Sequence, residues 1–166
     1  MDTQSIFQLL ISDVSAFNEW RIRYTDIRLD FSGMDFRGAE LCDALLVNVN
    51  CQNANFERAN LEYACMCNSD FTGANCAHTL ATGAHFGSIE VVEAHLPEMF
   101  KHYLNKGAIL DGVNFSYSDL AFSNFRNTSL NGTIFHAADL QHAHFASSSH
   151  KNAFFDDAAT EHAFFS

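Results

Sequence analysis

Large apolar residues recur at every fifth position over most of the chain. Two runs carry this period, residues 29–88 and residues 108–166, and the residue two places before each large one is usually small. In the second run Leu and Phe alternate at the large positions: Leu110, Phe115, Leu120, Phe125, Leu130, Phe135, Leu140 and Phe145. A period of five fits neither an α-helix nor a β-strand, so it predicts that one supersecondary unit repeats along the chain.

Several of these units combine a small residue, an Asp or Asn, and a large apolar residue. Clear examples are Ala54-Asn55-Phe56 and Ala138-Asp139-Leu140. This pattern resembles the pentapeptide-repeat family, and the resemblance covers the chain from residue 29 onward except near residues 87–107. It implies an all-β solenoid, a right-handed quadrilateral β-helix of about six coils, with one pentapeptide per side and twenty residues per coil.

A repeat of twenty residues decides which side chains are neighbours. The large and small inward residues fill the axis, and coils stack at the spacing of paired strands, each burying its core only against the next. Phe115, Phe135 and Phe155 should form one column, with Phe125 and Phe145 in another. We expect three coils in residues 29–88 and three in residues 108–166.

Residues 1–28 lack the period of five. Phe7, Leu10, Val14 and Phe17 recur at the spacing of an amphipathic helix. A solenoid exposes core side chains and ladder groups at an open end. We therefore predict an N-terminal capping α-helix over residues 1–28.

An insertion separates the two runs. Phe86 and Leu110 are 24 residues apart, which is not a multiple of five, so the register slips and residues 89–107 should leave the coil as a loop with a short helix. Pro97 would lie in its first turn and Gly107 would end it. A binding role for this segment and a tolerated insertion are both open. Its expected contact face, unless the side chains fold back onto the coil wall, is Met99, Phe100 and Tyr103.

The last coil should carry exposed aromatic residues. Phe154 and Phe164 precede inward positions and should face outward, while Phe165 is the last inward residue. Exposed aromatic rings at a coil edge favour self-association, and several members of the resembling family are similar in dimerising through C-terminal coils. We expect an end-to-end homodimer through Phe154, Phe164 and Phe165.

Charge restricts the class of partner. The chain has 20 acidic and 9 basic residues and a net charge of −11, which disfavours direct binding to nucleic acid or to anionic membranes and favours a basic protein partner. The family resemblance implies a second hypothesis, because some members regulate or protect the type II topoisomerases DNA gyrase and topoisomerase IV by mimicking DNA. The coils carry one net negative charge per about 3.2 Å of axis, against roughly 1.7 Å in duplex DNA. The charge is spread over both runs, so the sequence favours an interaction scaffold over a mimic.

Histidines and cysteines offer two weaker signals. His142 and His162 are twenty residues apart, and His144 should point to the same side, so the three could bind Zn²⁺ or Ni²⁺; ordinary surface histidines explain the same pattern. Cys65 and Cys67 flank an inward Met, so both should point outward as free thiols. We assign neither pattern to a metal site.

No catalytic or cofactor-binding residue is assigned. Nucleophile–base–acid sets, phosphate loops and metalloprotease helices do not emerge from the pattern. A signal peptide and an apolar membrane span are likewise not recognised. We expect a non-enzymatic, cytoplasmic protein without cofactors.

Overall fold

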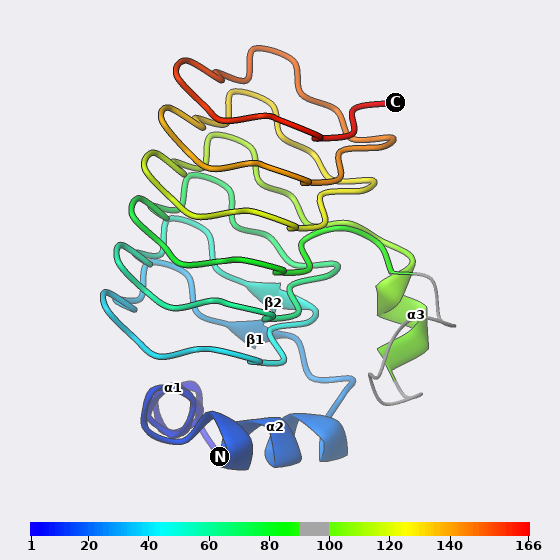
Figure 1. Cartoon of the computed structure of the whole chain (residues 1–166). Coiled ribbons are helices and arrows are strands. Elements are labelled where there is room, and N and C mark those ends of the chain that lie inside the picture. Colours follow the sequence, from blue (N-terminus) through cyan, green and yellow to red (C-terminus); the bar gives the residue numbers. More distant parts are fainter. Residues whose placement is uncertain (90–99) are drawn as a thin grey trace.

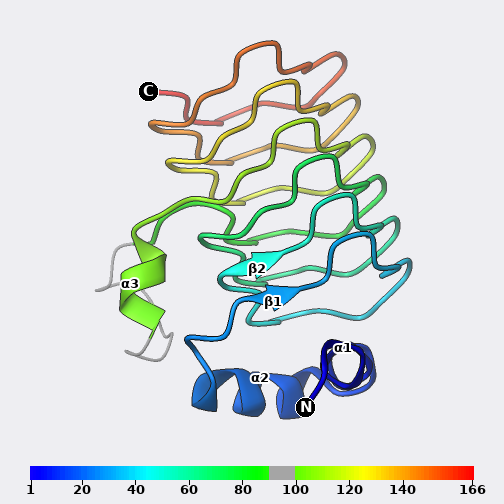
Figure 2. The ribbon, with the colours of Figure 1, turned by 180° about the vertical axis from the view of Figure 1, so that it is seen from behind.

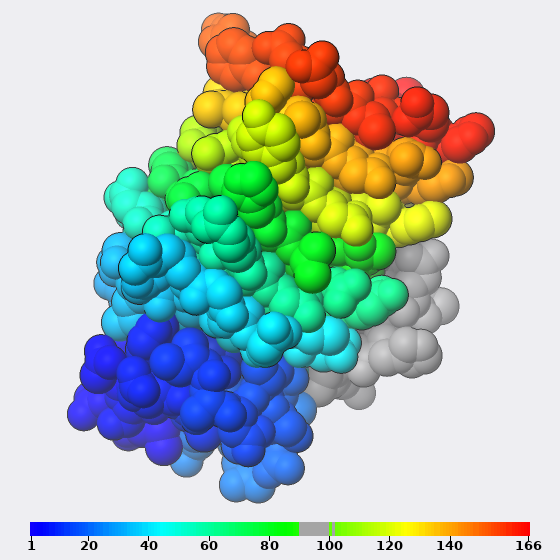
Figure 3. Space-filling model, turned by 60° about the vertical axis from the view of Figure 1, so that its left-hand side comes forward, coloured from blue at the N-terminus to red at the C-terminus, as the bar shows by residue number. Residues whose placement is uncertain are grey.

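The computed structural model describes residues 1–89 and 100–166, and it shows a stack of coils with helices at one end (Figure 1). β1 (Leu29–Asp30) pairs in parallel with β2 (Val49–Asn50), and isolated parallel bridges continue the ladder along the stack. One side passes through six levels: Asp30, Asn50, Asp70, Ile109, Ser129 and Ser149. Six coils therefore stack on one another. Figure 3 shows the sequence colours following one another from one end of the stack to the other.

Apart from the corner of the third coil where the insertion lies, each described corner has one residue at positive φ. At the first corner the Met34 amide donates to the Phe31 carbonyl over 3.1 Å, and Gly33 has a φ of +66°. A turn with positive φ only at its third residue is of type II, which favours Gly or Asn there. Asn53 and Gly73 take this position in the next two coils. Each side is thus a turn plus one bridging residue, which explains why longer strands do not form.

Stacked Phe rings fill the axis. Phe36 lies 4.5 Å from Phe56 with rings 3° from parallel, and Phe125 lies 4.8 Å from Phe145 at 6°. These separations match the spacing of paired strands, about 4.7–4.9 Å, so the ladder itself sets the ring stacking. Small inward polar residues can bond to the backbone, since the buried Ser123 hydroxyl donates to a carbonyl of the preceding coil over 2.7 Å.

Two helices, instead of the single predicted helix, lie across the first coil (Figure 2). α1 (Thr3–Ser12) and α2 (Val14–Arg23) meet at Asp13, whose carboxylate accepts a hydrogen bond from the third amide of α2 over 2.9 Å. This N-cap starts a new helix, so the apolar spacing continues while the chain changes direction. The ring of Phe7 lies 5.0 Å from Phe36 and extends the Phe stack into the helices. No helix among the described residues is long and apolar enough to cross a membrane.

The insertion leaves the repeat in phase. Bridges join residues 20 apart within each run, but 39 apart between Asp70 and Ile109. Nineteen extra residues therefore sit within the third coil, and Phe86 and Leu110 occupy consecutive inward positions. The Ala108 amide donates to the Phe86 carbonyl over 2.7 Å and closes the coil. The length of the insertion, not a slip in the repeat, accounts for the irregular spacing.

The insertion spans residues 88–106, and we call its described residues, 88–89 and 100–106, the arm. α3 (Lys101–Leu104) belongs to the arm and lies beside the coils in Figure 1. Pro97, expected in the first turn, lies outside the described residues. Gly107 has a role other than the expected helix stop, because a Cβ there would lie 2.4 Å from the Asn127 carbonyl oxygen. The chain thus re-enters the stack at a point where only glycine fits.

Candidate interaction surface

One wall of the solenoid carries apolar outward residues and lies beneath the arm. In the first two coils this wall, named the arm-covered wall, presents Leu45, Val47, Cys65 and Cys67. Phe100 and Leu104 of the arm pack against it and are 0% and 1% exposed. Burial of apolar side chains on both sides explains why the arm lies against the coils.

For Phe100 the structure shows the alternative left open by the sequence. Its side chain folds back onto the coil wall and is buried instead of forming part of an exposed contact face, because an apolar wall lies beneath it. Tyr103 is partly buried against the same cluster, and Met99 lies outside the described residues. Cys65 and Cys67 point outward as expected, but the arm buries both thiols.

A buried cation joins the N-terminal helices to this wall. The Arg21 guanidinium donates to the Val47 carbonyl over 2.7 Å and to the Tyr24 carbonyl over 2.6 Å, and it lies 5.5 Å from the centre of the Phe100 ring. Burial lowers the pKa of Arg21 to about 10. Hydrogen bonds and the aromatic face compensate the charge, so α2, the first coil and the arm meet at one residue.

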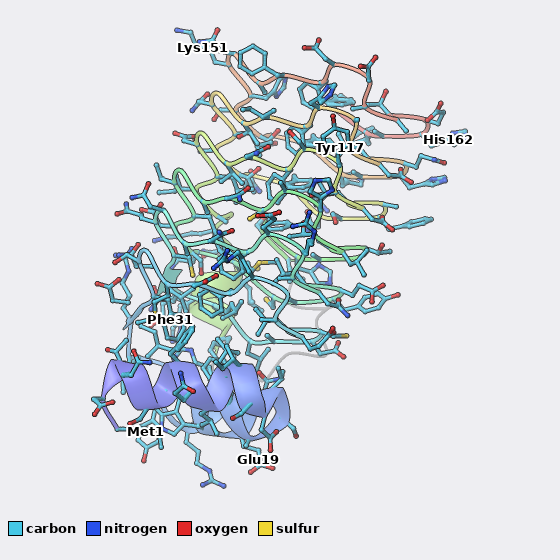
Figure 4. All side chains as sticks on the ribbon, turned by 90° about the vertical axis from the view of Figure 1, so that its left-hand side faces the viewer. Met1, Glu19, Phe31, Tyr117, Lys151 and His162 are labelled. Atoms are coloured by element: carbon cyan, nitrogen blue, oxygen red, sulfur yellow. The ribbon has the colours of Figure 1, made fainter. Side chains whose placement is uncertain are left out.

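Aromatic rings gather at two neighbouring corners of the solenoid, at the turn position that favours Gly or Asn. At the first corner His78 stacks on Tyr117 with centroids 5.1 Å apart. At the second, Phe122 stacks on His142 at 4.7 Å and His142 on His162 at 4.9 Å. Figure 4 labels Tyr117 and His162, one from each corner. All five residues have positive φ, an uncommon conformation for bulky side chains.

The largest of these rings face solvent. Tyr117 is 55% exposed and Phe122 is 63% exposed. Tyr63, at the second corner two coils below Phe122, is 57% exposed. Stacking pairs the rings along the axis but leaves their outer faces open to a partner.

The wall between these corners is acidic. Its two outward columns run through all six coils, and every residue in them is described; they are Glu40, Asn60, Leu80, Asp119, Asp139 and Ala159, and Cys42, Glu62, Thr82, Ala121, Gln141 and Glu161. These columns contain five carboxylates and no Lys or Arg. At the two corners, Asp43 and Asp157 add two acids and Arg58 adds one base, which pairs with Glu57. We call this surface, with its two corners, the acidic–aromatic wall.

The repeat in both runs matches a known family. The family model of pentapeptide repeats matches residues 35–73 and 108–145, with eight copies. The chain belongs to the pentapeptide-repeat family. The resemblance stated from the sequence is confirmed, and pentapeptide-repeat proteins fold as right-handed quadrilateral β-helices.

Solved structures of other pentapeptide-repeat proteins are similar to this chain. One, from the thylakoid lumen of Arabidopsis thaliana, is 26% identical with a TM-score of 0.48; the match covers 70% of this chain and 64% of that protein, so this chain spans less than two thirds of its length. Rfr23 from the cyanobacterium Cyanothece 51142 is 14% identical, with 92% and 99% coverage and a TM-score of 0.46. QnrB1, a plasmid-mediated fluoroquinolone resistance protein, is 14% identical, with 82% and 78% coverage and a TM-score of 0.37. No curated protein matches the sequence.

The sixth coil of this pentapeptide-repeat protein carries the exposed aromatic residues expected from the sequence. Phe154 is 51%, Phe164 46% and Phe165 41% exposed. Phe165 stacks on Phe145 at 4.7 Å and continues the axial column. The apolar rings lie on the sides and on the last level of the stack.

The three candidate metal ligands do not form one group. His142 stacks on His162, whereas His144 belongs to the next wall and lies 4.8 Å from the ring of Phe164. Among the described residues, no set of three or more His, Cys, Asp or Glu side chains is placed to hold a metal ion.

Sequence reasoning did not identify the acidic–aromatic wall. The signal is present, because aromatic residues follow inward residues by two positions at Tyr63, Tyr117 and Phe122. The sequence reasoning counted charge along the axis only, and in that direction the acids are spread over both runs. It did not compare the four sides of the coils, of which the acidic–aromatic wall carries the most acids. Columns drawn across the insertion would have shown this, once the length of the insertion was known.

Proposed function

We propose that this pentapeptide-repeat protein is a non-catalytic scaffold that binds a basic segment of a protein partner on its acidic–aromatic wall. The observation that supports this proposal is that the two outward columns of the wall hold five carboxylates and no Lys or Arg, with exposed aromatic rings at both corners. Carboxylates attract Lys and Arg side chains, and aromatic faces add cation–π attraction within about 6 Å. An Arg-rich or Lys-rich extended segment lying along the axis would meet both.

The test uses an arginine-rich peptide as the probe and two charge-matched variants. Asp119→Asn with Asp139→Asn removes two charges from the wall, whereas Asp30→Asn with Asp70→Asn removes two from the opposite side of the coils, where each aspartate accepts the same kind of amide hydrogen bond. An Asn side chain still accepts the hydrogen bond that each wall aspartate receives from the amide two residues later, so the turns persist. We expect the wall variant to weaken peptide binding about fivefold more than its control, since a contact charge acts at close range. An equal loss in both variants would show general attraction to an acidic protein and contradict the proposal.

The arm is proposed to contribute Tyr103 to partner binding, together with Met99, which lies outside the described residues. Tyr103 is the partly exposed aromatic residue of α3, whereas Phe100 serves to hold the arm in place. A Tyr103→Ala variant measured with the same peptide tests this part. Weaker binding supports a shared site, and unchanged binding restricts the site to the acidic–aromatic wall.

We also propose that two copies join end to end through their sixth coils. The exposed rings of Phe154, Phe164 and Phe165 supply the apolar contact. Sedimentation should show a dimer that dissociates when Phe154 and Phe164 are both replaced by Asn. A monomer at high concentration of the unchanged protein would rule the dimer out.

A second candidate function is regulation or protection of a type II topoisomerase, DNA gyrase or topoisomerase IV, by DNA mimicry. The observation that favours it is the presence of seven acids and one Arg on the acidic–aromatic wall, since a mimic of a phosphate backbone needs acids gathered on one side. A supercoiling assay with purified gyrase distinguishes this function from that of a scaffold. Unchanged supercoiling, with no protection from a quinolone, would leave only the scaffold.

We propose a cytoplasmic location for the scaffold. All five cysteines are free, and reduced thiols are usual in that compartment.

A further inference from the structure

Two cysteine thiols lie within reach of each other on the arm-covered wall. Cys65 and Cys67 point to the same side of an extended segment, and their Sγ atoms are 3.6 Å apart. Residues two apart on such a segment have Cα atoms about 6.6–6.8 Å apart, at the upper end of the range that disulfides span. An S–S bond of about 2.05 Å requires the sulfurs to approach by roughly 1.5 Å. The pair can therefore be bridged by local adjustment.

The arm separates this thiol pair from solvent. Cys65 is 2% and Cys67 is 0% exposed, and Ile89, Phe100 and Leu104 pack over them. A small oxidant reaches the pair when the arm opens locally. Lys106, at the base of the arm, is exposed, and exposed segments are the ones that open at low free-energy cost. Access to the thiols and the position of the arm are thus linked.

The other thiols differ in their surroundings. Cys51 and Cys76 are fully buried in the solenoid axis, and burial raises the pKa of both. On the wall, the single Cys67 thiol proton is donated to the Gly87 carbonyl while both thiols are protonated. When Cys65 ionises, this proton turns to the Cys65 sulfur, and that hydrogen bond lowers the pKa of Cys65 and raises that of Cys67. Cys65 is consequently the member of the pair that ionises first and attacks as a thiolate.

A thiol proton also takes part in anchoring the arm. Cys67 Sγ donates to the Gly87 carbonyl over 3.0 Å, at the residue where the chain leaves the third coil. A Cβ at Gly87 would lie 2.3 Å from the Arg126 amide nitrogen, so the backbone is tightly held at this point. The Ile89 amide then donates to the Leu104 carbonyl over 2.7 Å and closes the base of the arm.

We propose that Cys65 and Cys67 are a peroxide-oxidised pair whose disulfide releases the Gly87 carbonyl and loosens the arm from the wall. The Cys65 thiolate attacks one peroxide oxygen, the O–O bond breaks, and the other oxygen leaves as hydroxide, which takes a proton to become water. Cys65 is then a sulfenic acid. The Cys67 sulfur attacks the Cys65 sulfur, the S–O bond breaks, and the hydroxyl leaves as water with the Cys67 proton. Two thiols and one hydrogen peroxide thus give one disulfide and two waters, and a dithiol reverses the oxidation.

The first measurement is mass spectrometry after peroxide treatment. The tryptic peptide that follows Arg58 carries Cys65 and Cys67 and also Cys76, which serves as an internal reference. After treatment, denaturation and alkylation, we expect this peptide to carry one alkyl group, on Cys76, and to lack two hydrogens. In Cys67→Ser the reaction should stop at a sulfenic acid on Cys65 that dimedone traps. Cys42→Ser is the matched control and should oxidise like the unchanged protein. Retention of three alkylated cysteines in the unchanged protein would overturn the proposal.

The second measurement is trypsin cleavage after Lys106, at the base of the arm. We expect oxidation to raise the rate roughly fivefold to tenfold in the unchanged protein and in Cys42→Ser, the change expected when one hydrogen bond no longer opposes local opening. Cys65→Ser should show no change with peroxide. Formation of the disulfide with an unchanged cleavage rate would overturn the release of the arm.

Discussion

The arm-covered wall and the acidic–aromatic wall share a corner but treat apolar side chains in opposite ways. On the first, Val47 and Phe100 are fully buried because a segment of the same chain lies over the coils. On the second, Tyr117 and Phe122 remain more than half exposed beside a column of carboxylates. Both walls consist of outward positions of the same repeat, so the repeat itself does not decide which of them is covered.

The difference indicates which outward apolar residues are not needed for folding of the coils. An apolar residue at an outward position needs a cover or a partner, and the arm supplies the cover on one wall. On the other wall the rings also occupy positive-φ positions, where Gly or Asn would be less strained. Neither exposure nor strain helps the coils to fold, and the partner contact proposed above would account for both.

The largest expected effect comes from removing the cover. Phe100→Ala leaves a cavity above the wall and takes the aromatic face from Arg21, so we expect a loss of about 3–5 kcal/mol in unfolding free energy. Tyr117→Ala on the acidic–aromatic wall is the matched control and should cost no more than about 1 kcal/mol, mainly for ring stacking. Urea unfolding followed by circular dichroism measures both. Equal losses would show that the two walls do not differ in packing.

A glycine pair tests the corner of the acidic–aromatic wall. Gly83 has a φ of +66° and a Cβ there would lie 2.7 Å from the ring of Tyr63, whereas Gly33 has the same φ and open space around it. Either change to Ala should cost about 1–2 kcal/mol because of the left-handed backbone. Gly83→Ala must also displace the Tyr63 ring, so it alone should weaken binding of the arginine-rich peptide. Equal peptide binding by the two variants would contradict a role for Tyr63.

The arm-covered wall also predicts a pH dependence. His85 lies above Cys65, its Nδ1 has no hydrogen-bond partner among the described residues, and burial lowers the pKa of His85 below 6.5. The unfolded chain therefore binds this proton first, and stability should fall as the pH drops from about 6.5 to the lowered value, by at most about 1.4 kcal/mol per pH unit. Asp35 does not contribute in this window, since the hydrogen bonds from Arg37 hold its pKa at about 2.

Variants separate this effect from the other histidines. His85→Asn should remove its part of the slope, measured as urea stability between about pH 7 and pH 5. His142→Asn, at an exposed corner, is the control. It should keep the contribution of His85 to the slope of stability against pH, because His85 is unchanged. An unchanged slope in His85→Asn would contradict the assignment.

The fold could be predicted because inward positions are set locally. Each Phe such as Phe125 meets only the residues one coil away, so a period of five and a repeat of twenty fix the core. The surfaces depend on longer-range information. The arm folds onto Cys65 along a path that no period specifies, and Leu80 aligns with Asp119 only when the nineteen inserted residues are counted. The break at Asp13 was missed because both helices keep one apolar spacing.

The smallest expected effect on stability is the most informative for function. Phe122→Asn removes an exposed ring that stacks on His142, which costs about 0.5–1.5 kcal/mol. It also places Asn at a φ of +59°, the conformation that Asn48, Asn68 and Asn127 adopt at another corner, which relieves strain of similar size. We expect the two terms to offset, so that unfolding free energy changes by less than about 1 kcal/mol. Binding of the arginine-rich peptide should nevertheless weaken, because the net charge is unchanged and only the aromatic face is lost. Undiminished binding would show that the carboxylates bind the peptide without the rings, and it would contradict a role for the aromatic residues in the site.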